Sequence, residues 1–266
     1  MSGAAVGRQS ILRIDTAVRR FGGLVAVNEM SFEILRGQVA GLIGPNGAGK
    51  STMFDLITGV RPVTSGDIYF RENRVTHAPP HTRSPMGMAR TFQIVRLFHG
   101  MTVLENVLLG FHPKFPGGIV RALFSRRALS RQDRSARERA MELLDFVGLA
   151  SRAADAIGHL TLGQLRLVDI ARALASDPVL LMMDEPAAGL NDAETRNLLE
   201  MILTLKTRGL TMLVVEHDID FIMSACDRIV VMDRGAKIAD DTPDHVRANE
   251  KVIAAYLGRR AADAAH

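Results

Sequence analysis

The segment GPNGAGKST at residues 44–52 constrains the fold of this 266-residue chain more than any other feature. It satisfies the pattern G-x-x-x-x-G-K-[ST], follows an apolar run at 39–43 and leads into a helix-like stretch at 50–57. Glycines let the backbone turn tightly and direct N–H groups toward one anion, and the following helix adds its positive dipole end. The pattern therefore predicts a phosphate loop between a strand and a helix.

Each residue type in this loop has an expected task. Lys50 is expected to reach the β- and γ-phosphates of a nucleoside triphosphate, and the Ser51 hydroxyl to bind Mg²⁺. The alternative is a glycine-rich turn with an incidental lysine, which the strand before it and the helix after it disfavour. The residues predicted to surround the phosphates are Gly44, Pro45, Asn46, Gly47, Ala48, Gly49, Lys50, Ser51 and Thr52.

Two acids follow a second apolar run, at 179–183. In a parallel sheet the carboxyl ends of the strands meet at one edge, where ligands bind. Asp184 is therefore expected to hold Mg²⁺, directly or through water, and Glu185 to polarise an attacking water. A solvated turn is the alternative, and the phosphate loop elsewhere in the chain weakens it.

A third apolar run, at 211–215, leads to His217. A histidine at a strand end is more often structural than catalytic, but this one would arrive at the same edge of the sheet and could contact the γ-phosphate. Gln93, in the segment RTFQ, is a weaker candidate because an isolated glutamine is usually a surface residue.

The order of apolar runs predicts an α/β fold with a parallel core sheet. Short runs near the N-terminus, at 11–15, 30–34 and 66–70, predict an antiparallel β layer, and residues 103–175 are mostly helix-like. We predict one domain over residues 1–266. Its parts are a nucleotide-binding core (1–93 and 177–258), an inserted helical subdomain (94–176) and a frayed tail (259–266).

Composition excludes few classes of protein. One cysteine, Cys226, precludes an internal disulfide, and no run approaches the roughly 20 apolar residues of a membrane-spanning helix. No secretory signal is visible at the N-terminus. The net charge of +4 is too small to indicate nucleic acid, lipid or phosphate as a partner.

Taken together, these motifs resemble the ATP-binding subunits of ABC transporters, from about Leu12 to Gly258. The resemblance implies ATP and Mg²⁺ as cofactors and a P-loop NTPase fold. It implies that Phe21 stacks on adenine, that Gln93 joins the core to the helical subdomain and that His217 is a switch histidine. Glu185 would be the general base. The implied catalytic residues are Glu185, His217, Lys50 and Gln93, and the implied metal ligands are Ser51, Gln93 and Asp184.

The segment LTLGQ at 160–164 resembles the signature motif of the family. The resemblance implies that Thr161, Gly163 and Gln164 open a helix, over about 164–175, that faces the nucleotide held by a second subunit. Leu162 replaces a glycine there, which is expected to hinder close approach. Segment 187–192, AAGLND, resembles the D-loop of the family, with Asn191 in place of the usual aspartate.

Several segments resemble the branch of the family that imports branched-chain amino acids, among them EPAAGLN and the closing VIAAYLG. The implied partners are a second ATPase subunit (identical or related), integral membrane permease subunits and an extracytoplasmic solute-binding protein, with no nucleic acid. The implied location is the cytoplasmic face of the inner or plasma membrane, as a peripheral protein.

Four alternatives remain open at this point. Urea or amide import and lipid or lipopolysaccharide export keep the transport ATPase and change its cargo. A soluble ABC ATPase acting on DNA or ribosomes lacks support because the chain has one domain and no sustained heptads. A small-molecule P-loop kinase leaves residues 160–164 unexplained.

The arginine-rich stretch Arg121–Arg139 has two interpretations. It either contacts lipid headgroups or an acidic permease loop, or it forms a solvated helical face, which we favour.

Overall fold

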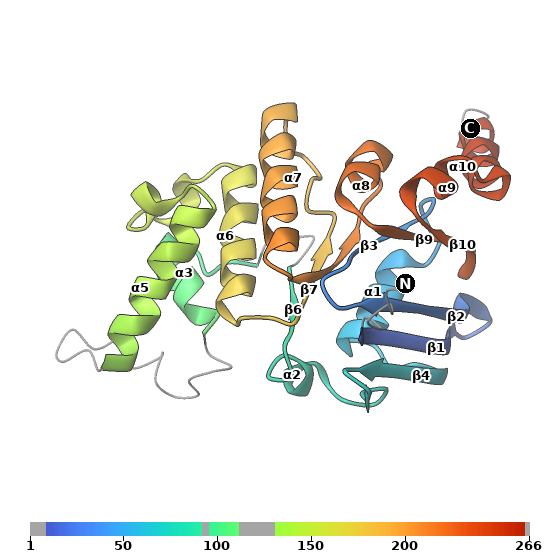
Figure 1. Ribbon diagram of the computed structural model, residues 1–266, viewed down its shortest axis with the longest axis horizontal. Coiled ribbons are helices and arrows are strands. Elements are labelled where there is room, and N and C mark those ends of the chain that lie inside the picture. The colour runs from blue at the N-terminus through green and yellow to red at the C-terminus, as the bar shows by residue number, and fades with distance from the viewer. Residues whose placement is uncertain (1–8, 92–95, 112–130, 264–266) are drawn as a thin grey trace, which may run out of the picture. The chain divides into compact units, whose positions relative to one another are not determined.

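The computed structural model describes residues 9–91, 96–111 and 131–263 (Figure 1). The chain divides into two compact units. The first unit comprises Met1–Pro80 and Ile202–His266, and the second comprises His81–Met201. The functional subdomains expected from the sequence, with boundaries at 93/94 and 176/177, stay a prediction.

The N-terminal part of the first unit is an antiparallel sheet with the strand order β2-β1-β4-β5. Strands β1 and β2 form a hairpin whose ends pair Phe21 with Leu24, so that Gly22 and Gly23 make the turn. Gly22 has φ 56°, which glycine adopts without steric cost. The antiparallel layer is therefore confirmed, with longer strands than the apolar runs indicated. Its strands are β1 Ser10–Phe21, β2 Leu24–Leu35, β4 Ser65–Phe70 and β5 Asn73–Arg74.

The first unit also holds a group of parallel strands. Strand β3 (Val39–Ile43) lies between β8 (Thr211–Val215) and β9 (Arg228–Asp233), parallel to both. Every residue of β3 and β8 is buried, which is why these strands are continuous apolar runs rather than alternating ones. Strand β10 (Ala236–Asp241) pairs antiparallel with β9, an addition that the sequence did not reveal.

Short helices complete the first unit, and the last of them, α10, runs to Asp263. The frayed tail expected at 259–266 stays a prediction. None of the described helices is both long enough and apolar enough to cross a membrane. The helices are α1 Lys50–Thr58, α8 Ile219–Ala225, α9 Pro243–Arg247 and α10 Glu250–Asp263.

The second unit joins a strand pair to a group of helices. Strands β6 and β7 are parallel, and helices α3, α5 and α6 pack against one another (Figure 1). The predicted helical insertion is thus present, and the fold class is confirmed. The elements are α2 Pro80–Arg83, which begins at the unit boundary, β6 Met88–Arg90, α3 Val103–Leu109, α5 Arg131–Phe146, the 3₁₀ turns Ala150–Arg152 and Ile157–His159, α6 Leu162–Ala175, β7 Leu180–Asp184 and α7 Asp192–Thr207, which ends beyond the boundary.

Candidate functional site

The phosphate loop connects β3 to α1 in the first unit, as predicted. Two of its glycines have no room for a side chain. A Cβ on Gly44 would lie 2.1 Å from the Met232 carbonyl oxygen, and one on Gly49 would lie 2.3 Å from the Ala26 carbonyl oxygen. Gly49 also has φ 104° at the start of α1. Glycine at these positions is therefore required by packing against β9 and β2.

Lys50, the first residue of α1, is folded back over the loop. Its ammonium group donates to the Gly44 carbonyl oxygen at 2.6 Å and to the Pro45 carbonyl oxygen at 3.2 Å. The side chain is buried, whereas the neighbouring Ser51 and Asn46 are exposed. A lysine held over a ring of backbone atoms next to a helix N-terminus suits an anionic ligand.

Phe21 lies at the tip of the β1–β2 hairpin in the same unit. Its side chain is 36% exposed. The guanidinium of Arg19 stands 4.5 Å from the ring centroid and that of Arg61 stands 5.4 Å away. A half-exposed aromatic ring held by cation–π contacts can stack on a nucleobase. The adenine role of Phe21 stays a prediction.

His217 follows β8, as expected, and the structure adds a residue that sequence reasoning missed. The Glu216 carboxylate is fully buried and accepts from the backbone N–H of His217 at 3.0 Å. The imidazole Nδ1 lies 3.3 Å from the same carboxylate, while the His217 side chain is 60% exposed. Glu216 thus sets the ring orientation and leaves the imidazole accessible to a ligand. Its place next to a histidine at a strand end was the available signal.

Asp184 ends β7 in the second unit, with only 3% of its surface exposed. One carboxylate oxygen lies 3.4 Å from an Nη atom of Arg90 on β6. Carboxylate oxygens are hard ligands of the kind that Mg²⁺ prefers, so Asp184 suits this ion chemically. The exposed hydroxyl of Ser51, in the first unit, has the same ligand chemistry, and the metal roles of both residues stay predictions.

Glu185 occupies an unusual backbone conformation directly after β7. Its φ is 48°, which is uncommon for a residue with a side chain and recurs at functional sites. The Glu185 carbonyl oxygen accepts a hydrogen bond of 2.6 Å from Arg166 of helix α6. Arg166 was not among the predicted residues, because it stands 19 positions away on another element. It ties the predicted general base to the signature helix.

The signature segment forms a capping box at the start of α6. The Thr161 hydroxyl accepts from the Gln164 amide, and the Gln164 side chain accepts from the Thr161 amide at 3.0 Å. The helix therefore begins at Leu162, two residues before the predicted start. The Gln164 oxygen is also 3.3 Å from Arg152. Gln164 thus serves the helix cap here, and its contact with nucleotide stays a prediction.

Leu162 and Gly163 pack against the segment that resembles a D-loop, within the same unit. A Cβ on Gly189 would lie 3.0 Å from the Leu162 side chain. A Cβ on Gly163 would lie 2.5 Å from Glu194. Glu194 in turn accepts from the Asn191 amide at 3.0 Å, and the Asn191 side chain accepts from Glu194 and Ala193 amides at the start of α7. The two segments form one packed cluster, which we call the signature cluster (residues 161–164 and 189–194).

Two predictions fall wholly or partly on residues that the structure does not describe. Gln93 lies outside the described residues, so its catalytic and metal roles stay predictions. Of the basic stretch Arg121–Arg139, only the part from 131 onward is described, where Arg134, Arg137 and Arg139 are exposed on α5. Arg139 lies 3.4 Å from Glu142, which matches a solvated helical face.

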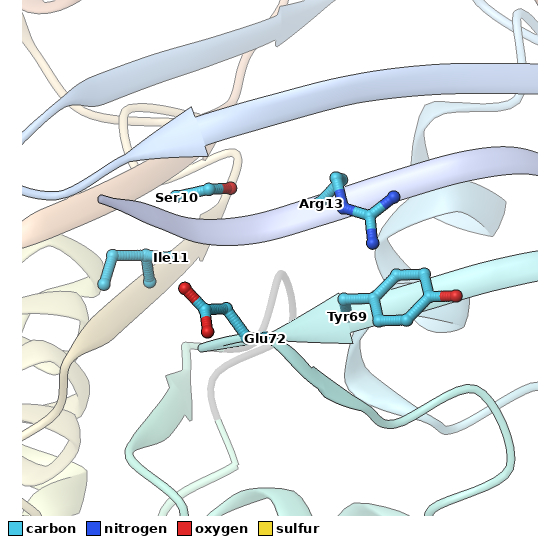
Figure 2. Close-up of a pocket in the computed structure, with 5 residues that line it drawn as sticks. All are labelled: Ser10, Ile11, Arg13, Tyr69 and Glu72. Atoms are coloured by element: carbon cyan, nitrogen blue, oxygen red, sulfur yellow. The ribbon is translucent and has the colours of Figure 1, made fainter. Parts of the chain in front are cut away.

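A small cavity lies on the antiparallel sheet of the first unit (Figure 2). Its volume is about 80 Å³, which is below the roughly 300 Å³ of small-molecule sites. Arg13 stands over the Tyr69 ring, 4.0 Å from its centroid. The cavity therefore does not accommodate a nucleotide. Its lining residues are Ser10, Ile11, Arg13, Tyr69 and Glu72.

Comparison with known families gives two matches along the chain. Residues 27–188 match the ABC transporter family. Residues 236–262, which contain β10, α9 and most of α10, match the branched-chain amino acid ATP-binding cassette transporter family.

Individual proteins are similar over nearly the whole chain. The high-affinity branched-chain amino acid transport ATP-binding protein LivG of Salmonella typhimurium is 41% identical over 251 residues, covering 94% of this chain and 98% of LivG. The ADP conformation of MJ1267, an ATP-binding cassette of an ABC transporter, has a TM-score of 0.81 and 33% identity, with 94% of this chain and 99% of that one covered. MJ0796, a dimeric ATP-binding cassette bound to ADP and Pi in a post-hydrolysis state, has a TM-score of 0.73 and 26% identity, covering 88% and 99%.

Proposed function

Because this chain belongs to the ABC transporter family of ATP-binding proteins, we propose that it is the ATPase subunit of an importer for branched-chain amino acids. The observation that carries this proposal is the match of residues 236–262 to the branched-chain amino acid cassette family, on a chain whose other segments match the general family. The 41% identity to LivG over 94% of the chain supports the same cargo.

In this proposal the phosphate loop binds the triphosphate of ATP. Its amides and Lys50 neutralise negative charge, and Lys50 exchanges the loop carbonyls for phosphate oxygens. Ser51, Asp184 and Gln93 are the residues that would hold Mg²⁺, which would supply electrostatic stabilisation of the transferred phosphoryl group. Phe21 stacks on the adenine, with Arg19 and Arg61 fixing its ring.

The chain's own acids and bases orient the attacking water. Glu185 accepts the proton of the water, and its position depends on the hydrogen bond from Arg166 to its carbonyl oxygen. His217 contacts the γ-phosphate, with Glu216 fixing the imidazole. Positioning and electrostatics account for catalysis of phosphoryl transfer. In this proposal both depend on the contacts of Arg166 with Glu185 and of Glu216 with His217.

A second ATPase subunit completes each nucleotide site. The helix α6 of one subunit presents Thr161, Gly163 and its N-terminal dipole to the nucleotide held by the other. ATP therefore joins two subunits, and its hydrolysis releases them. The two ATPase subunits bind permease subunits at the cytoplasmic face of the membrane and couple ATP hydrolysis to transport through them. An extracytoplasmic binding protein delivers the amino acids to the permease.

Uptake of labelled leucine tests the cargo. A strain that lacks the gene for this chain would carry the wild type, Lys50→Ala or Lys251→Ala at equal expression, with valine and urea as competitors. Lys251 is an exposed lysine on α10 and serves as the matched control. We expect wild type and Lys251→Ala to restore uptake that valine inhibits and urea does not, and Lys50→Ala to fail.

The alternatives give different results. If urea but not valine inhibited the uptake, the proposed cargo would be urea or a related amide rather than a branched-chain amino acid. Leucine uptake that is normal without the chain would refute import of branched-chain amino acids, and a defect of the outer membrane in that strain would indicate lipid or lipopolysaccharide export.

A further inference from the structure

One arginine outside the signature segment (residues 160–164) holds that segment at both ends. Arg152 ends the 3₁₀ turn Ala150–Arg152, in the same unit as the segment. One Nη atom of its guanidinium donates to the His159 carbonyl oxygen at 3.0 Å, directly before the segment. The other Nη atom donates to the Gln164 side-chain oxygen at 3.3 Å, at the end of the segment. The planar fork of a guanidinium can reach two acceptors at once, and here it connects the two ends.

Arg152 itself stands on a fixed support. Its Nε atom donates to the Asp155 carboxylate. The Leu104 amide, in the first turn of α3, donates to the Ala153 carbonyl oxygen at 2.9 Å. The Val103 amide donates to the Asp155 carbonyl oxygen at 3.0 Å. The first amides of a helix have no partner within the helix, so these bonds join the Arg152 turn firmly to the start of α3.

The bond from Arg152 also decides which polar group of Gln164 remains for a ligand. The Gln164 side-chain oxygen accepts from the Thr161 amide at 3.0 Å as well as from Arg152, which occupies both of its lone pairs. Within the described part of the chain, the NH₂ group of the same side chain has no hydrogen-bond partner. An NH₂ group donates, so it suits a phosphate oxygen, whereas the carbonyl oxygen would repel one.

We propose that Arg152 is a positioning residue for the signature segment, and that it holds this segment in the conformation that receives the nucleotide of a second subunit. The inference rests on the proposed pairing of two ATPase subunits and adds a residue on which that pairing depends. A segment held in its binding conformation loses less entropy when the ligand arrives. Loss of the Arg152 contacts should therefore weaken the ATP-dependent dimer and leave nucleotide binding by the chain's own phosphate loop unchanged.

Arg152→Met tests this role, because methionine keeps an unbranched apolar side chain and removes all three hydrogen bonds. The variant is made in a Glu185→Gln background, where slow hydrolysis should let ATP-bound dimers accumulate, and dimerisation is measured by sedimentation. We expect dimerisation to weaken about tenfold for each nucleotide site, the equivalent of one hydrogen bond from a charged donor, and about a hundredfold for two sites. The affinity for ADP, from calorimetry, should be unchanged.

Two further variants serve as controls. Arg152→Lys keeps the positive charge next to Asp155 but lacks the planar fork that reaches both ends of the segment, so it should restore little of the lost affinity. Arg139→Met removes an exposed arginine of α5 that lies 3.4 Å from Glu142. Because a surface pair of this kind contributes little, Arg139→Met should dimerise like its parent.

Amide hydrogen exchange tests the Arg152 contacts without a second subunit. The amides of Thr161 and Gln164 close the capping box of α6. In the nucleotide-free Arg152→Met chain these two amides should exchange about tenfold faster than in the wild type, because local opening then breaks fewer hydrogen bonds. Arg139→Met should leave their exchange unchanged.

The outcomes separate this inference from the proposed function. Unchanged exchange at Thr161 and Gln164 would overturn the positioning role, as would parental dimerisation of Arg152→Met or full recovery in Arg152→Lys. A loss of ADP affinity in Arg152→Met would also overturn it, because the effect would then be general. Absence of an ATP-dependent dimer in the Glu185→Gln parent would instead refute the proposed pairing and the nucleotide role of Arg152 with it, whereas the exchange rates would still decide whether Arg152 holds the segment.

Discussion

Gly163→Ala is expected to destabilise the wild-type chain but to stabilise a chain in which Glu194 has been replaced by alanine. Gly163 lies in α6, and a Cβ there would come 2.5 Å from a Glu194 carboxylate oxygen. That carboxylate also accepts from the Asn191 amide at 3.0 Å. The substitution therefore displaces Glu194 from a charged hydrogen bond within the signature cluster.

The magnitudes follow from two opposing effects. Loss of a hydrogen bond to a charged group costs about 1.5–3 kcal/mol of unfolding free energy. Replacing glycine by alanine in a helix raises the unfolding free energy by about 0.5–1 kcal/mol. Gly163→Ala should therefore destabilise the wild-type chain by about 1–2 kcal/mol. In a Glu194→Ala background the clash is gone, and the same change should stabilise by up to about 1 kcal/mol, less whatever the nearby Leu190 side chain opposes.

A double-mutant cycle in denaturant measures this coupling. The four chains are the wild type, Gly163→Ala, Glu194→Ala and the double variant, each unfolded by urea without nucleotide. Equal effects of Gly163→Ala in both backgrounds would refute the reasoning, because Glu194 would then move aside without cost. ATP hydrolysis is a separate readout. It should stay low in the double variant, since the added methyl group still blocks the approach of α6 to a nucleotide.

Two further predictions concern the proposed nucleotide site. Glu185→Gln keeps the backbone and its hydrogen bond from Arg166, so ATP binding should persist while hydrolysis falls at least a hundredfold; hydrolysis at the wild-type rate would remove Glu185 from the role of base. Phe21→Ala should weaken ATP binding by about 1–3 kcal/mol and leave tripolyphosphate binding unchanged, because only ATP carries a base to stack. An equal loss for both ligands in calorimetry would contradict a stacking role.

The sequence predicted the elements that depend on local pattern. Strands 39–43 and 211–215 were predicted at their observed bounds because both are short apolar runs buried on all sides. The phosphate loop was recognisable because its glycines, lysine and serine stand at fixed spacing on one continuous segment. Strand β10 was missed because an antiparallel edge strand with exposed positions has no continuous apolar run.

Contacts between segments that are distant in the chain could not be predicted from the sequence. Arg166 donates to the carbonyl oxygen of Glu185. Every residue type has such a carbonyl, so the residue at position 185 does not indicate that its backbone accepts this hydrogen bond. Contacts between two side chains can be inferred from complementary chemistry, but contacts between a side chain and a main-chain group become visible only in the three-dimensional structure. The supporting residues of a site are therefore harder to predict than its reactive ones.

The two departures from the family pattern, Leu162 and Asn191, acquire a common explanation from the signature cluster. Leu162 was expected to obstruct the approach to a nucleotide, but its side chain also packs against Gly189. Asn191 performs the capping that an aspartate would, because its side-chain oxygen accepts two amides at the start of α7. Between them, Gly163 leaves the space that Glu194 fills. Both departures lie in the signature cluster, so a substitution at Leu162, whose side chain lies against Gly189, should alter the conformation of the segment at 189–194.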